Sequence, residues 1–234
     1  MKKFELTTEF ITNALGKKLF RIKALVEFGS VKAGELGGYA EKEENISQDG
    51  NAWVSGDARV YGNAWVSGDA RVYGDALVSD NAKVFGNAEV YGDAKVFGNA
   101  WVSDDACVYG DAKVFGNAWV SGDALVSGNA KVFGNAEVYG DTEVSGDAKV
   151  SDNAEVSGDA DYALVKGFGA EFRCTTFYRG KNKKIMVNCG CFHGDLEEFR
   201  KQVKETRNGK IAKEYLMIAD LMEYHFTGEG SDDE

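Results

Sequence analysis

The chain has 234 residues and a formal net charge of −11, and residues 50–160 carry almost all of that charge, with seven basic against seventeen acidic residues. This balance argues against a basic footprint for nucleic-acid binding, and no segment approaches the roughly 20 apolar residues of a membrane span. The first residues lack the apolar run of a signal peptide and the four cysteines are unevenly spaced, so we expect a cytoplasmic protein without a disulfide scaffold.

Residues 1–49 are predicted to form a β cap and a lead-in to the segment that follows. Lys3–Thr8 and Lys18–Val26 have strand-like composition, and the stretch around Asn13–Gly16 between them is typical of a turn. Three glycines between residues 34 and 38 indicate a loop. Stacked repeats expose strand edges at their ends, so we expect this antiparallel hairpin to cover the N-terminal end of the repeat domain.

Residues 50–162 form a hexapeptide-repeat domain. Eighteen valines stand six residues apart from Val54 to Val156, and the residue two places before each valine is alanine everywhere except at Thr142. Because strand side chains alternate between two faces, alanine and valine point inward and the two variable residues point outward. A Gly-Asp or Gly-Asn pair then turns the chain, since these residues tolerate positive φ. Each hexapeptide is therefore a short strand and one corner of a solenoid.

The corners indicate three hexapeptides in each coil. Sampled every eighteen residues, two of the three corners are mostly aspartate, whereas the third is asparagine each time: Asn63, Asn81, Asn99, Asn117, Asn135 and Asn153. Stacked asparagine side chains can hydrogen-bond from one coil to the next. Eighteen strands then give about six coils, a stack ~30 Å tall at ~4.8 Å per coil.

The repeat resembles the hexapeptide pattern of left-handed parallel β-helices, in which a small residue follows an aliphatic one by four places, as in Val60-Tyr61-Gly62-Asn63-Ala64. That superfamily includes acyltransferases and γ-type carbonic anhydrases. The hexapeptide sequences Gly-Asn-Ala-Trp-Val-Ser and Gly-Asp-Ala-Arg-Val-Tyr are most similar to those of uncharacterised hexapeptide-repeat proteins of bacteria and their prophages. Those proteins are labelled as transferases or polymer-forming cytoskeletal proteins. The resemblance implies a left-handed parallel β-helix, and it alone implies the handedness.

Residues 163–227 are predicted to form a small ββαα module. Glu171–Tyr178 and Lys184–Cys191 are strand-like and flank a turn, which is typical of a hairpin. Apolar residues spaced three and four apart predict helices over Asp195–Arg207 and Ile211–Phe226. The acidic tail, residues 228–234, is predicted to be disordered.

Catalysis has little support in the residues. The resemblance implies a histidine base between the solenoids of a trimer for acyl transfer, and a zinc site of three histidines for an anhydrase. The chain has only His193 and His225, both in the C-terminal module, and the repeat contains neither a histidine nor an inserted loop. We predict no catalytic residue and no cofactor, and keep as the alternative an acyltransferase-like enzyme whose base lies in the module.

Cys174, Cys189, Cys191 and His193 offer a candidate zinc site. A hairpin that turns symmetrically about Lys181–Asn182 would place Cys174 opposite Cys189, with the other two residues following on the same strand face. These side chains suit tetrahedral zinc, but small buried thiols are also common in protein cores. We favour packed thiols over zinc or a redox pair, and no metal site is predicted.

Three rows of outward aromatic residues are the predicted interaction sites. They recur at the coil period and comprise Trp65, Trp101 and Trp119; Phe97, Phe115 and Phe133; and Tyr73, Tyr91 and Tyr109. Such rows either support only one another or form a contact face for a protein. The sequence predicts a non-catalytic acidic scaffold, phage- or prophage-encoded, that forms a homo-oligomer such as a trimer or binds a host protein. A DNA mimic that inhibits a host protein is a further alternative.

Overall fold

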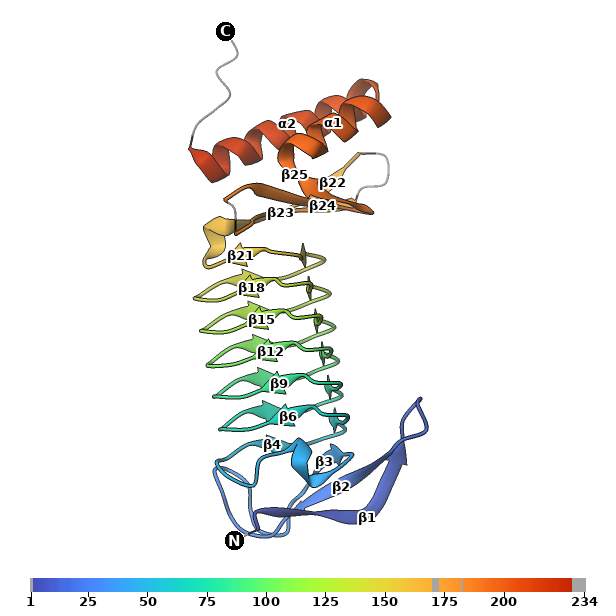
Figure 1. The fold of residues 1–234 in the computed structure, drawn as a ribbon, viewed down its shortest axis with the longest axis vertical. Coiled ribbons are helices and arrows are strands. Elements are labelled where there is room, and N and C mark those ends of the chain that lie inside the picture. The colour runs from blue at the N-terminus through green and yellow to red at the C-terminus, as the bar shows by residue number, and fades with distance from the viewer. Residues whose placement is uncertain (1, 170–172, 182, 229–234) are drawn as a thin grey trace.

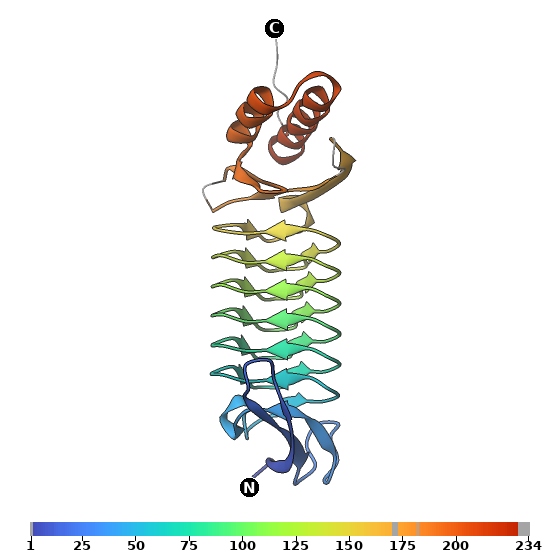
Figure 2. The same ribbon diagram turned by 90° about the vertical axis from the view of Figure 1, so that its right-hand side faces the viewer.

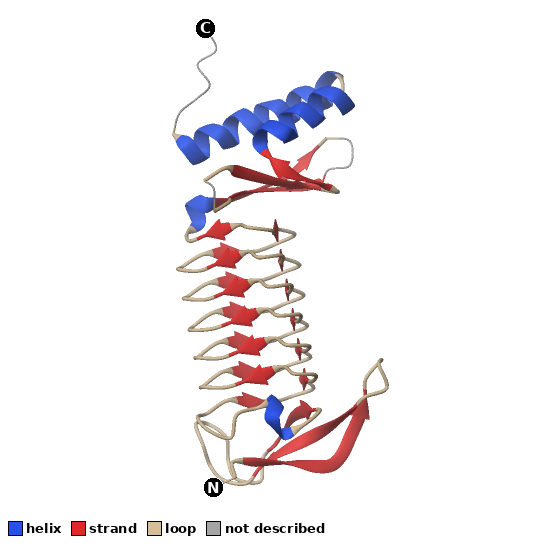
Figure 3. Cartoon of the chain, viewed as in Figure 1, coloured by secondary structure: helices blue, strands red, loops and turns tan. Residues whose placement is uncertain are grey.

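A computed structural model describes residues 2–169, 173–181 and 183–228, so the predicted disordered tail beyond Gly228 lies outside the described residues. The molecule is a rod with three parts along its length (Figure 1). An N-terminal cap of antiparallel strands lies at one end, a stack of coils forms the middle, and a sheet covered by two helices lies at the other end (Figure 3). No helix in these described ranges is long and apolar enough to cross a membrane.

Eighteen two-residue strands build the stack, and each consists of one outward residue and the repeat valine after it. Strands eighteen residues apart pair in parallel and in register, as Val60 does with Val78, so the predicted three strands per coil are confirmed. The strands are β4 (Trp53–Val54), β5 (Arg59–Val60), β6 (Trp65–Val66), β7 (Arg71–Val72), β8 (Leu77–Val78), β9 (Lys83–Val84), β10 (Glu89–Val90), β11 (Lys95–Val96), β12 (Trp101–Val102), β13 (Cys107–Val108), β14 (Lys113–Val114), β15 (Trp119–Val120), β16 (Leu125–Val126), β17 (Lys131–Val132), β18 (Glu137–Val138), β19 (Glu143–Val144), β20 (Lys149–Val150) and β21 (Glu155–Val156).

The strands form three parallel sheets, one on each side of the rod (Figure 2). The solenoid has about seven turns rather than the predicted six. The extra turn comes from the lead-in: β3 (Leu36–Ala40) pairs in parallel with β5, and Ile46 bridges Val66. This segment lacks the Ala-x-Val motif, so the hexapeptide period did not predict the additional turn.

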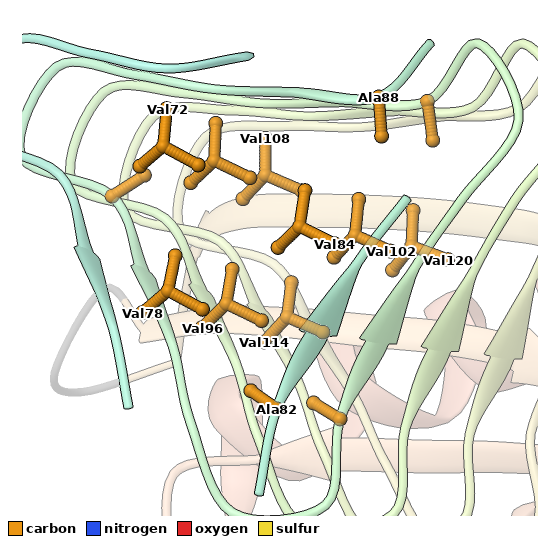
Figure 4. Close-up of a cluster of buried hydrophobic side chains, with 14 of the residues drawn as sticks. Val72, Val78, Ala82, Val84, Ala88, Val96, Val102, Val108, Val114 and Val120 are labelled. Carbon is orange, nitrogen blue, oxygen red and sulfur yellow. The ribbon is translucent and has the colours of Figure 1, made fainter. Parts of the chain in front are cut away.

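Alanine and valine form a continuous core along the axis of the rod (Figure 4). The repeat valines and alanines are 0–1% exposed. Thr142, the one exception to the alanine column, is also buried, and its hydroxyl donates to the carbonyl oxygen of Tyr139 at 2.8 Å. The hydroxyl therefore keeps a partner inside the core, so the substitution does not leave a buried polar group unsatisfied.

The corners are held by backbone geometry and by side-chain ladders. Gly134 has a φ of 72°, and a Cβ there would lie 2.6 Å from the backbone nitrogen of Asp152 in the next coil, so a side chain does not fit. The predicted asparagine ladder is confirmed: five amide hydrogen bonds of 2.9–3.4 Å run from Asn63 to Asn153.

The N-terminal hairpin is confirmed. β1 (Phe4–Thr12) pairs antiparallel with β2 (Lys18–Ala24), and β2 pairs antiparallel with β3, which extends one solenoid sheet to nine strands. A single 3₁₀ turn, Glu43–Asn45, follows within the lead-in. Trp53 of the first repeat strand is 6% exposed because Phe4 and Phe28 pack edge-on against it. The cap therefore covers the end of the apolar core.

Lys3 is a buried cation in this cap. Its Nζ donates to the carbonyl oxygens of Ala52 at 3.0 Å and Gly50 at 3.2 Å, and it lies 4.8 Å from the centre of the Phe28 ring. Burial lowers the pKa of Lys3 from 10.5 to about 8, although the nearby carboxylates of Asp49 and Asp69 act in the opposite direction. The folded chain therefore holds this proton less tightly than the unfolded chain does.

The free energy of unfolding should consequently rise with pH through this group between pH 8 and 10.5, since the unfolded state binds more protons there. Lys3→Met removes the titrating group, so wild type should gain about 2–3 kcal/mol over the variant across this window. Urea unfolding at a series of pH values measures the difference. Lys23→Met, at an exposed position of β2, is the control, and parallel pH profiles for wild type and Lys3→Met would contradict the prediction.

The C-terminal module is a four-stranded antiparallel sheet with two helices on one face. Its strands are β22 (Tyr162–Phe168), β23 (Arg173–Arg179), β24 (Ile185–Cys189) and β25 (Phe192–Asp195), and its helices are α1 (Leu196–Thr206) and α2 (Gly209–Thr227); a 3₁₀ turn, Asp159–Asp161, precedes β22. The predicted hairpin and both helices are present, while β22 and β25 were not predicted. A glycine interrupts β22 at residue 167, and β25 is too short to show an alternating pattern.

The sheet of the module lies across the last coil of the solenoid (Figure 1). Alternate residues of β23 face opposite sides. Tyr178 joins the solenoid core, whereas Phe177 packs under the helices with Phe199 and Met222. The module therefore closes the C-terminal end of the rod in the position that a further coil would occupy.

Candidate interaction faces and the solenoid–module junction

The tryptophan row lies on the six-stranded sheet formed by β6, β9, β12, β15, β18 and β21. The outward residues of its first four strands, in order along the rod, are Trp65, Lys83, Trp101 and Trp119, which we call the tryptophan face; Glu137 and Glu155 follow on the last two strands. The three indoles remain 39–42% exposed. Trp101 and Trp119 meet edge to face at 6.1 Å, and the Lys83 ammonium lies 4.6 Å from the centre of the Trp101 ring. The face thus combines large apolar area with one cation.

The tryptophan rings are held in place by their neighbours. Phe85 packs edge-on against Trp101 at 6.1 Å, and the Nε1 of Trp119 donates to the hydroxyl of Ser103 at 3.1 Å. The strands underneath are fixed by the backbone ladder between coils. A face ordered in this way loses little side-chain entropy when it binds a partner.

The phenylalanine and tyrosine rows stack face to face within the chain. Ring centres lie 4.9 and 5.0 Å apart along Phe97–Phe115–Phe133 and 4.8 and 5.0 Å apart along Tyr73–Tyr91–Tyr109, with planes within 3° of parallel. Neighbouring coils therefore cover the stacked ring faces, and these side chains are partly buried. The stacked rows support the coils, whereas the tryptophan face offers more free apolar surface.

A lysine row borders the phenylalanine row. Lys95, Lys113, Lys131 and Lys149 are in register on consecutive strands. With Asp93, Asp111, Asn129 and Asp147 at the preceding corner, they line an open groove of about 390 Å³. The aspartate side chains offset the repulsion between stacked lysines. The groove is polar, and its residues repeat without a distinct catalytic group.

The candidate zinc residues do not converge. Thr175, not Cys174, pairs with Cys189, and a one-residue change of register places a side chain on the opposite face of the sheet. The chain also reverses after β24, so His193 pairs with Asn188 on the neighbouring strand instead of continuing the strand of Cys189. Among the residues that the structure describes, no group of three His, Cys, Asp or Glu side chains could hold a metal ion. The assumed turn centre, Asn182, lies outside the described residues.

His193 instead joins the module to the solenoid. Its Nδ1 lies 2.8 Å from the Oδ1 of Asn188, and its Nε2 lies 2.7 Å from the Oδ2 of Asp152 in the last coil. Asp152 stands at a corner where most coils have glycine, with a φ of 57°. At the equivalent corner of another coil, Asp80 accepts a hydrogen bond from the backbone N–H of Gly98 in the next coil. At the end of the stack, His193 takes the place of that donor.

Asn188 is the centre of this junction and is 7% exposed. Its Nδ2 donates to the carbonyl oxygen of Lys149 at 2.9 Å, to the hydroxyl of Ser151 at 3.0 Å and to that of Tyr178 at 3.2 Å. Burial raises the pKa of Tyr178 to about 12, so its hydroxyl stays protonated and able to donate. Sequence reasoning missed this cluster because its members come together only when the module docks.

The junction does not arrange a nucleophile and its base. Ser151 is 1% exposed, and its hydroxyl donates to the Oδ2 of Asp152 at 3.1 Å and lies 3.2 Å from the hydroxyl of Tyr178. The Nε2 of His193 contacts the same Oδ2 of Asp152 at 2.7 Å, not the serine hydroxyl. A nucleophilic serine needs the histidine within hydrogen-bond reach of its own hydroxyl. His225, the other histidine, lies exposed near the end of α2 beside Phe226. The geometry is that of a structural clamp.

One family model, described as YdcK Beta solenoid repeat, matches residues 52–68. A comparison with curated proteins finds no match. The matched residues hold the strands β4, β5 and β6, one from each side of the rod. The chain therefore carries a YdcK-type β-solenoid repeat within a β-solenoid fold.

Proposed function

We propose that the protein is a non-catalytic scaffold whose tryptophan face binds another protein surface, with a second copy of the chain as one partner. The observation that carries the proposal is the set of three indoles that stay 39–42% exposed on one flat side of the rod. Large apolar groups exposed on one side of a protein are typical of interaction surfaces. Tryptophan is also enriched among the residues that dominate binding energy at protein interfaces.

Two further features support this proposal. The rod is rigid along its length, because every coil is hydrogen-bonded to the next through backbone and corner side chains. Its acidic repeat limits non-specific self-adhesion, since like net charges repel at long range. A rigid rod with one apolar face can align a partner along several coils.

Trp101→Ser combined with Trp119→Ser should lower the mass of the assembly, because the variant removes most of the apolar area of the tryptophan face and leaves the core unchanged. Multi-angle light scattering measures the mass, and circular dichroism checks the fold. The matched control is Leu77→Ser with Leu125→Ser, which removes outward apolar side chains from the other two sheets.

An unchanged mass in the double tryptophan variant would remove the tryptophan face as a contact surface. Isothermal titration with coenzyme A tests the main alternative. Binding that is lost in His193→Ala would support the acyltransferase alternative and contradict the scaffold proposal.

A further inference from the structure

Helix α2 exposes an apolar stripe on the side that faces away from the rest of the module. Met217, Leu221 and Tyr224 are 60%, 58% and 58% exposed, and their spacing of four and three places them along one face of the helix. We call these three residues the α2 stripe. The opposite face, with Tyr215, Ile218 and Met222, is buried on the sheet and on α1. The helix needs its buried face for folding, so the stripe is unused by this chain.

The stripe lies at the far end of the rod. The helices are on the face of the module's sheet opposite to the solenoid (Figures 1 and 2). Nothing in the described part of the chain packs over Met217 or Leu221, whose exposed fractions are among the largest of any apolar side chain. A partner can approach this surface along the axis of the rod without meeting a coil.

Two opposite charges flank the stripe on one edge. Lys213 and Asp220 are both exposed and stand seven residues apart, two helical turns along the same side. Asp220 shares Arg200 with Glu197 and Glu223, at distances of 2.9, 2.7 and 2.6 Å from the guanidinium nitrogens. Three carboxylates around one guanidinium leave a surplus of negative charge at this end of the edge, while Lys213 makes the other end positive.

We propose that the α2 stripe is the docking surface for a second copy of this chain, packed antiparallel with the two-fold axis near Met217. An isologous interface must be self-complementary, so that residue i meets residue j and j meets i. In the antiparallel arrangement, Lys213 of each copy lies level with Asp220 of the other, which gives two ion pairs. Met217 meets its own counterpart at the axis, and Leu221 and Tyr224 cover the first half of the opposite helix.

The charge pattern is what selects a second copy as the occupant. A partner of unrelated sequence could bind whatever the charges of residues 213 and 220 are. In an antiparallel dimer of this chain these two residues face each other, so they must have opposite charges, as Lys213 and Asp220 do. The contact is small: α2 has 19 residues, ~28 Å of helix, which covers less surface than the ~800 Å² per partner of a standard interface. The dimer is therefore reversible, and its two solenoids extend in opposite directions from the paired helices.

Sedimentation of the full chain over a range of concentrations tests this inference. Wild type should show a concentration-dependent dimer. Lys213→Glu and Asp220→Lys, each alone, should raise the dimer dissociation constant about tenfold or more, because each places like charges opposite one another twice. An equimolar mixture of the two variants should restore dimers, since the mixed pair again has opposite charges at both contacts. Labelling one variant with a fluorophore shows that the restored species contains both.

Lys204→Glu and Glu205→Lys, which are exposed on α1, serve as matched charge controls and should leave the dimer unchanged. Leu221→Glu provides a second disruption that does not alter the Arg200 cluster, and thermal unfolding verifies that each variant folds. A monomeric wild type at every concentration, or a mixture that fails to restore the dimer, would overturn the inference.

The α2 stripe and the tryptophan face are separate surfaces, so the two proposals can fail independently. Loss of the tryptophan pair should leave the α2 dimer intact, and the α2 variants should leave any assembly through the tryptophan face intact.

Discussion

Ala100→Trp is expected to unfold the middle coils of the solenoid. Ala100 is 0% exposed and lies in a column between Ala82 and Ala118, with one coil on each side of it. Its carbonyl oxygen accepts a hydrogen bond from the backbone N–H of Lys83 at 2.9 Å, so the strand cannot move outward without breaking the ladder. A single overpacked core side chain typically costs about 1–3 kcal/mol, and an indole in a methyl-sized space should cost about 4 kcal/mol or more.

The expected loss is local at first, because each coil of a repeat protein contacts only its neighbours. Hydrogen exchange should show lost protection in the coils around residue 100 before the two ends unfold. Leu125→Trp is the control, since it adds the same ring at the outward position of a repeat strand, the position that Trp119 occupies in the preceding strand β15. Equal stability of Ala100→Trp and wild type in urea unfolding would show that the alanine column is not closely packed.

Asn188→Leu is expected to release the C-terminal module from the solenoid. Leucine keeps most of the volume but removes the donors to Lys149, Ser151 and Tyr178 and the contact with His193. Each buried polar group left without a partner costs about 1–3 kcal/mol, and some of these groups keep other hydrogen bonds. We expect a total loss of about 3 kcal/mol and an earlier unfolding transition for the module.

Limited proteolysis monitors this release, because a detached module exposes the segment between the last coil and β22. His193→Ala removes only the link to Asp152 and should have a smaller effect in the same direction. Asn208→Ala is the neutral control, since the side chain of Asn208 caps no hydrogen bond of α2. Cleavage of Asn188→Leu at the wild-type rate would show that apolar contacts around Tyr178 are sufficient to hold the module.

The solenoid was largely predictable from the sequence because its period, its inward residues and its corners all repeat in the chain. The alanine and valine columns follow from the alternation of side chains in a strand, which recurs in all eighteen hexapeptides. The asparagine ladder follows from the period of eighteen residues at one corner. The extra coil was not predictable in this way, since Ala40 and Ile46 lie in register with the repeat valines Val60 and Val66 but are not part of an Ala-x-Val hexapeptide. A coil can form wherever the backbone ladder and the core continue, whatever the exact repeat.

The junction and the module were less predictable for a different reason. The register of the β23–β24 hairpin differs by one residue from the symmetric turn, and that single step moves Cys174 to the other face of the sheet. Asn188, Asp152 and His193 come from three separate segments, so no spacing along the chain indicates that they meet. Likewise, sequence alone could not distinguish the exposed tryptophan face from the self-covering phenylalanine and tyrosine rows, because this depends on ring orientation.

The N-terminal cap and the C-terminal module cover the two ends of a stack of similar coils. Because the coils are similar, their number can change without a change in either end. Adding eighteen residues would add one coil of ~4.8 Å and leave both ends, and every face, in the same orientation. Adding six residues would instead turn one end by a third of a revolution relative to the other and bring the tryptophans onto different sides. The length of the rod can therefore change in whole coils while the direction of each outer face stays the same.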